Sequence, residues 1–295
     1  MKHIIFSTVF LYVITLSAQG KVTYTYAVKD GDSLKLDMCY PLDAKSTDTF
    51  PMLLWIHGGG FEGGSRDNEP EQELCRYAAN HGYIGVSISY RLLRKGTTTA
   101  FGCDCDNDEK LHVFREAVTD YLDAAHYLVE NARTFQIDTT KIIAGGSSAG
   151  AETVLDAAYM REYFIDDLKK YESVKFAGVL SLAGAMVNAN YITKENALPS
   201  VLFHGTSDEL VPFGTDAHHY CKTPTPGYLI LDGSSVVSDK LSKLETAYYF
   251  QMVKGAGHEI SSIPFNDLDN IFDFFDKTVF DHQIIQTKII SQKQP

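Results

Sequence analysis

The order of apolar and polar residues along the chain predicts buried strands that alternate with helices. MLLWIH (52–57) and YIGVSISY (83–90) are mainly apolar, as expected of strands covered on both faces of a parallel sheet. Strands 22–28 and 34–40 read as a hairpin that turns at Lys29-Asp30-Gly31-Asp32. Further strands are predicted at 141–145, 176–182, 201–204 and 247–253, and helices at 71–80, 110–132, 148–161 and 266–279.

This alternation is typical of an α/β protein: a mostly parallel central sheet with helices on both faces and an N-terminal antiparallel hairpin at one edge. No polar tract, repeat or Pro- and Ser-rich linker divides the chain, so residues 19–295 are expected to form one domain. Ligands of such sheets bind beyond the carboxyl ends of the strands. Unusual residues gather there in this chain, namely His57, Gly146, His204 and the segment after Val253.

The N-terminus has the pattern of a secretory signal peptide. A short basic start, Met1-Lys2-His3, precedes the apolar run 4–16 and the small-residue exit Ser17-Ala18-Gln19-Gly20. A membrane span needs roughly 20 apolar residues, so stable membrane anchoring is not expected. We therefore predict a signal peptide at 1–18, cleavage near Ala18, and a secreted or periplasmic protein.

Composition narrows the classes of partner and the redox chemistry. With 26 basic and 38 acidic residues the net charge is −12, which disfavours binding to nucleic acid or to an anionic membrane surface. Export would allow one or two disulfides among the five cysteines and leave at least one thiol unpaired. FGCDCDNDE (101–109) does not have the glycine and the final glutamate at the positions where a calcium loop requires them. We therefore expect a solvated or disulfide-tied loop and no metal site. The cysteines are Cys39, Cys75, Cys103, Cys105 and Cys221, and neighbours Cys103 and Cys105 are expected to pair elsewhere rather than with each other.

AGGSSAGAE (144–152) contains two adjacent serines between a predicted strand and a predicted helix. A nucleophile at such a sharp turn needs small residues two positions before and after it, which gives the Gly-x-Ser-x-Gly elbow. Ser148 has Gly146 before it and Gly150 after it, whereas Ser147 is followed at that distance by Ala149. The register favours Ser148, and the alternative is a helix N-cap behind a flexible turn.

Three other segments supply the groups that a serine nucleophile requires. HGGGF (57–61) follows a buried strand and offers unobstructed backbone N–H groups, HGTSDELVP (204–212) contains Asp208, and GAGHE (255–259) contains His258. Asp216 or Asp232 could be proposed in place of Asp208. The chain order Ser148, Asp208, His258, with the oxyanion loop upstream, is that of the α/β-hydrolase fold.

HGGGF, GGSSAG, HGTSDELVP and GAGHE together resemble the motifs of secreted carboxylesterases of the α/β-hydrolase superfamily, near the hormone-sensitive-lipase-like and bacterial feruloyl or acetyl esterase branches. The likeness runs from the opening hairpin to the terminal helix. It implies the α/β-hydrolase fold, with Ser148 as nucleophile, His258 as general base and Asp208 as the carboxylate that orients His258.

The resemblance further implies an oxyanion hole built from the N–H groups of Gly59, Gly60 and Ala149, and no metal or organic cofactor. Many relatives carry Asp or Glu directly before the nucleophile where this chain has Ser147, so branch and substrate stay open. Short-chain or carbohydrate-linked acyl esters are expected, with segments 91–109 and 183–199 as walls or a small cap. The oligomeric state is not indicated.

Two other functions fit part of the pattern. A secreted peptidase of the prolyl-oligopeptidase type shares the three groups but usually carries a separate large domain. A non-catalytic binding protein on a hydrolase scaffold usually lacks a member of the triad or the elbow, and this chain has all of them. An esterase is therefore the favoured interpretation.

Overall fold

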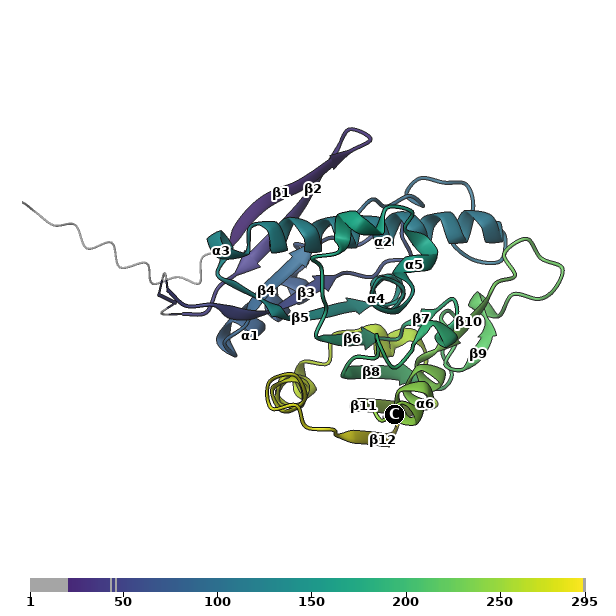
Figure 1. Cartoon of the computed structure of the whole chain (residues 1–295). Coiled ribbons are helices and arrows are strands. Elements are labelled where there is room, and N and C mark those ends of the chain that lie inside the picture. Colours follow the sequence, from purple (N-terminus) through teal and green to yellow (C-terminus); the bar gives the residue numbers. More distant parts are fainter. Residues whose placement is uncertain (1–20, 43, 46, 294–295) are drawn as a thin grey trace, which may run out of the picture.

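The computed structural model describes residues 21–42, 44–45 and 47–293, which form a nine-stranded sheet with helices on both faces and a small second sheet (Figure 1). The predicted signal peptide, residues 1–18, lies outside the described residues. The order across the large sheet is β1-β2-β4-β3-β5-β6-β8-β11-β12. These strands are Val22–Lys29 (β1), Asp32–Cys39 (β2), Phe50–Ile56 (β3), Ile84–Ile88 (β4), Ile137–Ser147 (β5), Gly178–Leu182 (β6), Ser200–Gly205 (β8), Tyr248–Lys254 (β11) and Gln286–Gln292 (β12).

The pairing of strands follows the predicted α/β pattern. All neighbours from β4 to β12 are parallel, while β2 is antiparallel to both β1 and β4. The mostly parallel sheet with an N-terminal antiparallel hairpin is thus confirmed. Because parallel strands end at the same edge, the segments after β3, β5, β8 and β11 meet there.

Helices lie on both faces of the sheet (Figure 1), and the side chains beneath them form two large hydrophobic cores. One core joins α1 and α7 to side chains such as Leu53 and Val201, and the other joins α2, α4 and α6 to side chains such as Leu54 and Leu202. Neighbouring residues of one strand therefore serve opposite faces, which explains the continuous apolar runs. The helices are Glu69–Asn80 (α1), Asn107–Glu130 (α2), Ala132–Phe135 (α3), Ala149–Tyr159 (α4), Arg161–Phe164 (α5), Ser234–Lys243 (α6) and Leu268–Phe275 (α7).

Several elements differ from the sequence-based expectation. The three-stranded sheet β7-β10-β9 (Ala185–Met186, Ile230–Gly233 and Thr215–Ala217), helix α6 and strand β12 were not predicted. The terminal helix is shorter than 266–279, because α7 ends at Phe275 and a π-helical turn, Asp276–Phe280, follows. Among the described residues, no helix combines the length and the apolar content needed to cross a membrane.

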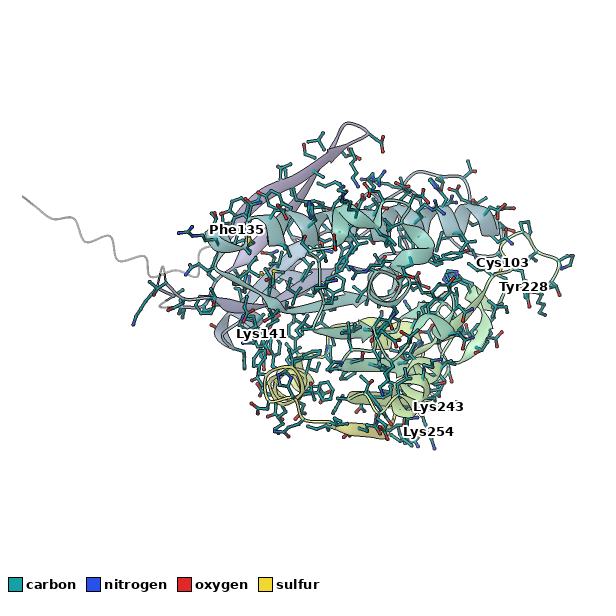
Figure 2. All side chains as sticks on the ribbon, in the orientation of Figure 1. Cys103, Phe135, Lys141, Tyr228, Lys243 and Lys254 are labelled. Carbon is teal, nitrogen blue, oxygen red and sulfur yellow. A yellow bond between two sulfur atoms is a disulfide. The ribbon has the colours of Figure 1, made fainter. Side chains whose placement is uncertain are left out.

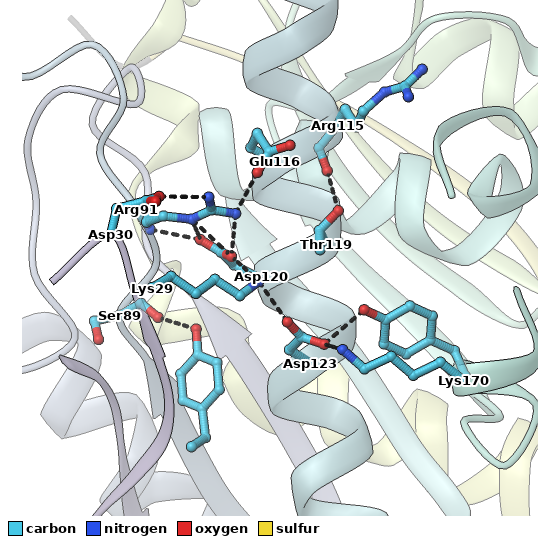
Figure 3. A network of polar contacts seen from close by, with 12 residues as sticks. Lys29, Asp30, Ser89, Arg91, Arg115, Glu116, Thr119, Asp120, Asp123 and Lys170 are labelled. Atoms are coloured by element: carbon cyan, nitrogen blue, oxygen red, sulfur yellow. Dashed lines mark hydrogen bonds and ion pairs between the residues drawn. The ribbon is translucent and has the colours of Figure 1, made fainter. Parts of the chain in front are cut away.

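A network of ion pairs fixes the opening hairpin and the segment after β4 to α2 (Figure 3). Arg91 donates to Asp120 at 2.8 Å and also contacts Glu116, while Lys29 donates to Asp120 at 2.7 Å. The Asp120 side chain is completely buried. Since a buried charge without its partner is strongly unfavourable, this network ties the edge of the sheet to its helical layer.

Candidate active site

The turn between β5 and α4 has the geometry of a nucleophile elbow. Ser148 adopts φ +51° and ψ −122°, a conformation that L-residues rarely hold and that this strand-to-helix turn demands. The flanking glycines are required by close approach. A Cβ on Gly146 would lie 2.4 Å from the carbonyl oxygen of Gly150, and a Cβ on Gly150 would lie 2.3 Å from that of Ile56.

Ser148, His258 and Asp208, which are far apart in the sequence, meet at the carboxyl edge of the sheet. Ser148 Oγ lies 2.7 Å from His258 Nε2, and His258 Nδ1 lies 2.8 Å from Asp208 Oδ2. His258 begins a one-turn 3₁₀ helix after β11, and Asp208 follows β8. The three side chains form one continuous hydrogen-bonded chain in which an ionised carboxylate accepts the Nδ1 proton, leaving Nε2 free to accept from the serine.

The loop that carries Asp208 is fixed by backbone hydrogen bonds. Asp208 Oδ1 accepts from the N–H groups of Leu210 and Val211 at 2.9 and 3.0 Å. Ser207 N–H donates to the carbonyl of Ala256, in the loop before His258, at 2.8 Å, so the loops of Asp208 and His258 are joined directly.

The carboxylate of Asp208 is held ionised by its histidine neighbours. Its side chain is fully buried, and burial alone raises its pKa, but contacts with His204 and His258 outweigh this and lower the pKa well below its usual range. His204 Nε2 lies 3.4 Å from Asp208 Oδ2, and its Nδ1 lies 2.8 Å from Ser234 Oγ. The alternatives Asp216 and Asp232 lie on β9 and β10, where Asp232 accepts hydrogen bonds from Ala189 and Thr215 instead.

The residues expected to form an oxyanion hole lie beside Ser148. Gly59, Gly60 and Ala149 line the same cleft as the serine. Ala149 is the first residue of α4, so its N–H has no acceptor within the helix. Two contacts of the buried His57 hold the glycine loop that follows β3. His57 Nδ1 lies 2.7 Å from the Gly58 carbonyl oxygen, and the His57 carbonyl accepts a hydrogen bond from the Tyr90 hydroxyl at 3.2 Å.

The cleft around Ser148 has a volume of about 870 Å³. From the predicted wall 91–109, Ala100 and Phe101 line it. The expectation for 183–199 is wrong, because this segment lines a second cavity of about 560 Å³ and contributes nothing to the lining of the active-site cleft. The reason is the unpredicted second sheet: β7 lies in this segment and pairs with β10.

Among the cleft residues that sequence reasoning did not single out are Glu152, His218 and His219. Cys221, two residues after this histidine pair, forms a disulfide with Cys103, which is labelled near Tyr228 in Figure 2. The disulfide-tied loop is thus confirmed for Cys103, while Cys105, like Cys39 and Cys75, is a buried free thiol. Glu152 could have been found, because an acidic residue one turn after Ser148 is unusual in a helix that is mainly apolar.

Comparison with known proteins agrees with this architecture. The BD-FAE family matches residues 36–186, just over half of the chain. Phenmedipham hydrolase of Pseudarthrobacter oxydans is 33% identical over 126 residues, 42% of this chain and 23% of that protein. Secreted triacylglycerol lipase LIP1 of Gibberella zeae is 28% identical over 168 residues, 56% of this chain and 27% of that protein. This chain therefore spans about a quarter of the length of these two relatives.

A solved structure of esterase 2 of Thermogutta terrifontis, phosphorylated by paraoxon, is similar with a TM-score of 0.66 at 18% identity, covering 88% of this chain and 95% of that one. At this identity the likeness shows the fold. The family match contains the HGGGF loop and the elbow at Ser148, while Asp208 and His258 follow it in the sequence. The chain belongs to the BD-FAE family and has the α/β-hydrolase fold.

Proposed function

We propose that this protein is a serine carboxylesterase. The observation that carries the proposal is the unbroken chain from Ser148 Oγ through His258 to the buried Asp208, with contacts of 2.7 and 2.8 Å. Its support from comparison is that the named relatives include a hydrolase and a secreted lipase. In this proposal residues 19–295 form a single catalytic domain.

The proposed reaction is acyl transfer through a covalent intermediate. His258 takes the proton of Ser148 as Oγ attacks the ester carbonyl, and Asp208 stabilises the imidazolium that forms. The N–H groups of Gly59, Gly60 and Ala149 would stabilise the oxyanion. Protonated His258 then donates its proton to the departing alcohol, and a water molecule activated by the same imidazole releases the acid.

The substrate and the compartment are further parts of the proposal. The cleft around Ser148 suits short-chain or carbohydrate-linked acyl esters better than long alkyl chains, because it is lined by glycines, polar side chains, Leu210 and Phe101. Export to the periplasm or the medium is supported by the N-terminal pattern and by the Cys103–Cys221 disulfide, a bond that persists in oxidising compartments.

The neighbouring serines offer a matched pair of variants to test the proposal. Ser148→Ala should reduce kcat for p-nitrophenyl acetate by a factor on the order of 10⁶. Ser147→Ala removes an equivalent hydroxyl one residue away and should retain at least a tenth of wild-type activity. Equal losses in both variants, or turnover that survives in Ser148→Ala, would refute the assignment. Faster cleavage of peptide p-nitroanilides than of any ester would favour the peptidase alternative.

A further inference from the structure

Two buried polar side chains on different elements meet at the wall of the active-site cleft. Glu152 on α4 is 2% exposed, His218 after β9 is 1% exposed, and both line the cleft. Glu152 Oε1 lies 3.3 Å from His218 Nε2, yet Glu152 Oε1 and His218 Nδ1 each lack a hydrogen-bond partner within the described part of the chain. Buried polar groups are nearly always satisfied, so this pair calls for an explanation.

Burial favours the uncharged form of both groups. Burial, and after it the nearby Asp156, raises the pKa of Glu152 well above its usual range. Burial, together with His219 and Lys110, lowers the pKa of His218 well below its usual range. A protonated carboxyl beside a neutral imidazole provides O–H and N–H donors as well as free acceptor lone pairs at one place in the wall.

The surrounding charges disfavour an ionic ligand. The completely buried Lys110 acts electrostatically on both Glu152 and His218, which opposes binding of a cation. Asp208 acts on Glu152 with the opposite sign, which opposes binding of an anion. The ring of Phe101 meets the ring of His218 edge to face at 5.4 Å between centroids, so this side of the pair is apolar. These neighbours select an uncharged polar atom.

The position of Glu152 fixes which part of a substrate could reach it. Its N–H donates to the Ser148 carbonyl at 2.9 Å, so it lies one helical turn after the nucleophile. Side chains at this spacing start about 5–6 Å apart on the same face of a helix. A group bound there lies only a few bonds from the carbonyl carbon that Ser148 attacks.

We infer that Glu152 and His218 form a hydrogen-bonding subsite for an uncharged hydroxyl or ether oxygen of the ester, a few bonds from the scissile carbonyl. The inference rests on the proposed esterase function and deepens it: the enzyme prefers esters that carry such an oxygen over isosteric esters that carry a methyl or methylene group. A site built to bond a hydroxyl discriminates against the analogue that lacks it, because its own polar groups are then left unpaired.

The test compares isosteric substrate pairs. One pair varies the acyl part: p-nitrophenyl butyrate and the ester whose terminal methyl is replaced by hydroxyl. The other pair varies the alcohol part: propyl acetate and ethylene glycol monoacetate. We expect the wild-type enzyme to favour the hydroxylated ester by about tenfold or more in kcat/KM in at least one pair.

Variants at Glu152 separate a neutral hydrogen-bonding role from a structural one. Glu152→Leu should reduce this preference to within about threefold, whereas Glu152→Gln, which keeps a donor and an acceptor, should retain most of it. Thr153→Val is the matched control, because Thr153 is a buried polar residue on the same helix that does not line the cleft. It should leave the ratio between the two esters unchanged. If Glu152→Leu fails to fold, His218→Phe carries the same expectation.

The outcomes distinguish the subsite from the proposed function. No preference in either pair, or a preference that survives in Glu152→Leu, overturns the subsite while leaving the esterase proposal intact. Loss of preference in Glu152→Gln as complete as in Glu152→Leu overturns the neutral-acid role. If the wild-type protein hydrolyses no ester, the proposed function falls and the subsite falls with it.

Discussion

Replacing Asp208 by asparagine tests whether the buried carboxylate orients His258, the proposed catalytic base. In the folded protein, Asp208 Oδ2 accepts the Nδ1 proton of His258 over 2.8 Å, which leaves Nε2 free to accept from Ser148. An amide NH₂ at the Oδ2 position would face that N–H donor. The imidazole would then favour the other tautomer, with its proton on Nε2, and could not accept the proton of Ser148.

The magnitude follows from this change of tautomer. The corresponding substitution in a Ser-His-Asp triad lowers kcat by about 10⁴, equivalent to about 5.4 kcal/mol of transition-state stabilisation. Stability should change less, because the amide oxygen of asparagine can still accept from the N–H groups of Leu210 and Val211, which lie 2.9 and 3.0 Å from Asp208 Oδ1. We expect a loss of about 1–3 kcal/mol from the missing charge-assisted hydrogen bonds to histidine.

The sign of the pH dependence also follows. The folded-state pKa of Asp208 is lowered, so its contribution to stability is present above the usual aspartate pKa of about 3.9 and is lost as the pH falls through the folded-state value. The difference in stability between wild type and Asp208→Asn should therefore narrow below about pH 4.

The assay is kcat for p-nitrophenyl acetate together with urea unfolding of the same preparations. Asp216→Asn is the control, since Asp216 is an exposed aspartate on β9 that the sequence alone offered as an alternative acid. It should behave like wild type in both measurements. The reasoning is refuted if Asp208→Asn keeps more than a tenth of wild-type kcat, or if its loss of activity only follows a loss of folded protein.

Two further predictions concern stability. The Cys103–Cys221 disulfide closes a loop with a sequence separation of 118, so Cys103→Ala/Cys221→Ala should lower the free energy of unfolding by up to about 5 kcal/mol in urea titrations; an unchanged midpoint would contradict this. Asp120→Ala should cost about 3–5 kcal/mol because Arg91 and Lys29 lose a fully buried partner. Asp30→Ala, which removes an exposed partner of Arg91, should cost less than about 1 kcal/mol, and equal shifts in the two melting temperatures would argue against the network.

The central fold could be predicted because its strands are buried on both faces. β3 and β4 show this as continuous apolar runs, and the elbow glycines mark the end of β5. β12 could not be predicted in this way: most of its residues are exposed, and it is a strand only because it pairs with β11 along its whole length. The same holds for β7, β9 and β10, which are two to four residues long and exist through pairing with one another.

The candidate triad and the cleft wall differ in how they depend on the fold. Ser148, Asp208 and His258 each follow a parallel strand, so the topology alone brings them to one edge. The wall of the cleft depends on tertiary contacts, which no local sequence pattern predicts. His219 and Tyr220 both hold positive φ angles, +56° and +50°, in a segment anchored by the disulfide of Cys221.

Such backbone strain persists only where the surrounding structure imposes it, and it cannot be inferred from residues that are neither glycine nor asparagine. Glu152 is intermediate between the candidate triad and the cleft wall in how far the sequence predicts it. The sequence predicts its helical spacing from Ser148, but its partner His218 belongs to the segment with the strained backbone. The residues proposed for the chemistry are therefore set by topology, whereas His218, proposed with Glu152 for substrate choice, is set by a loop that could be remodelled while the triad stays in place.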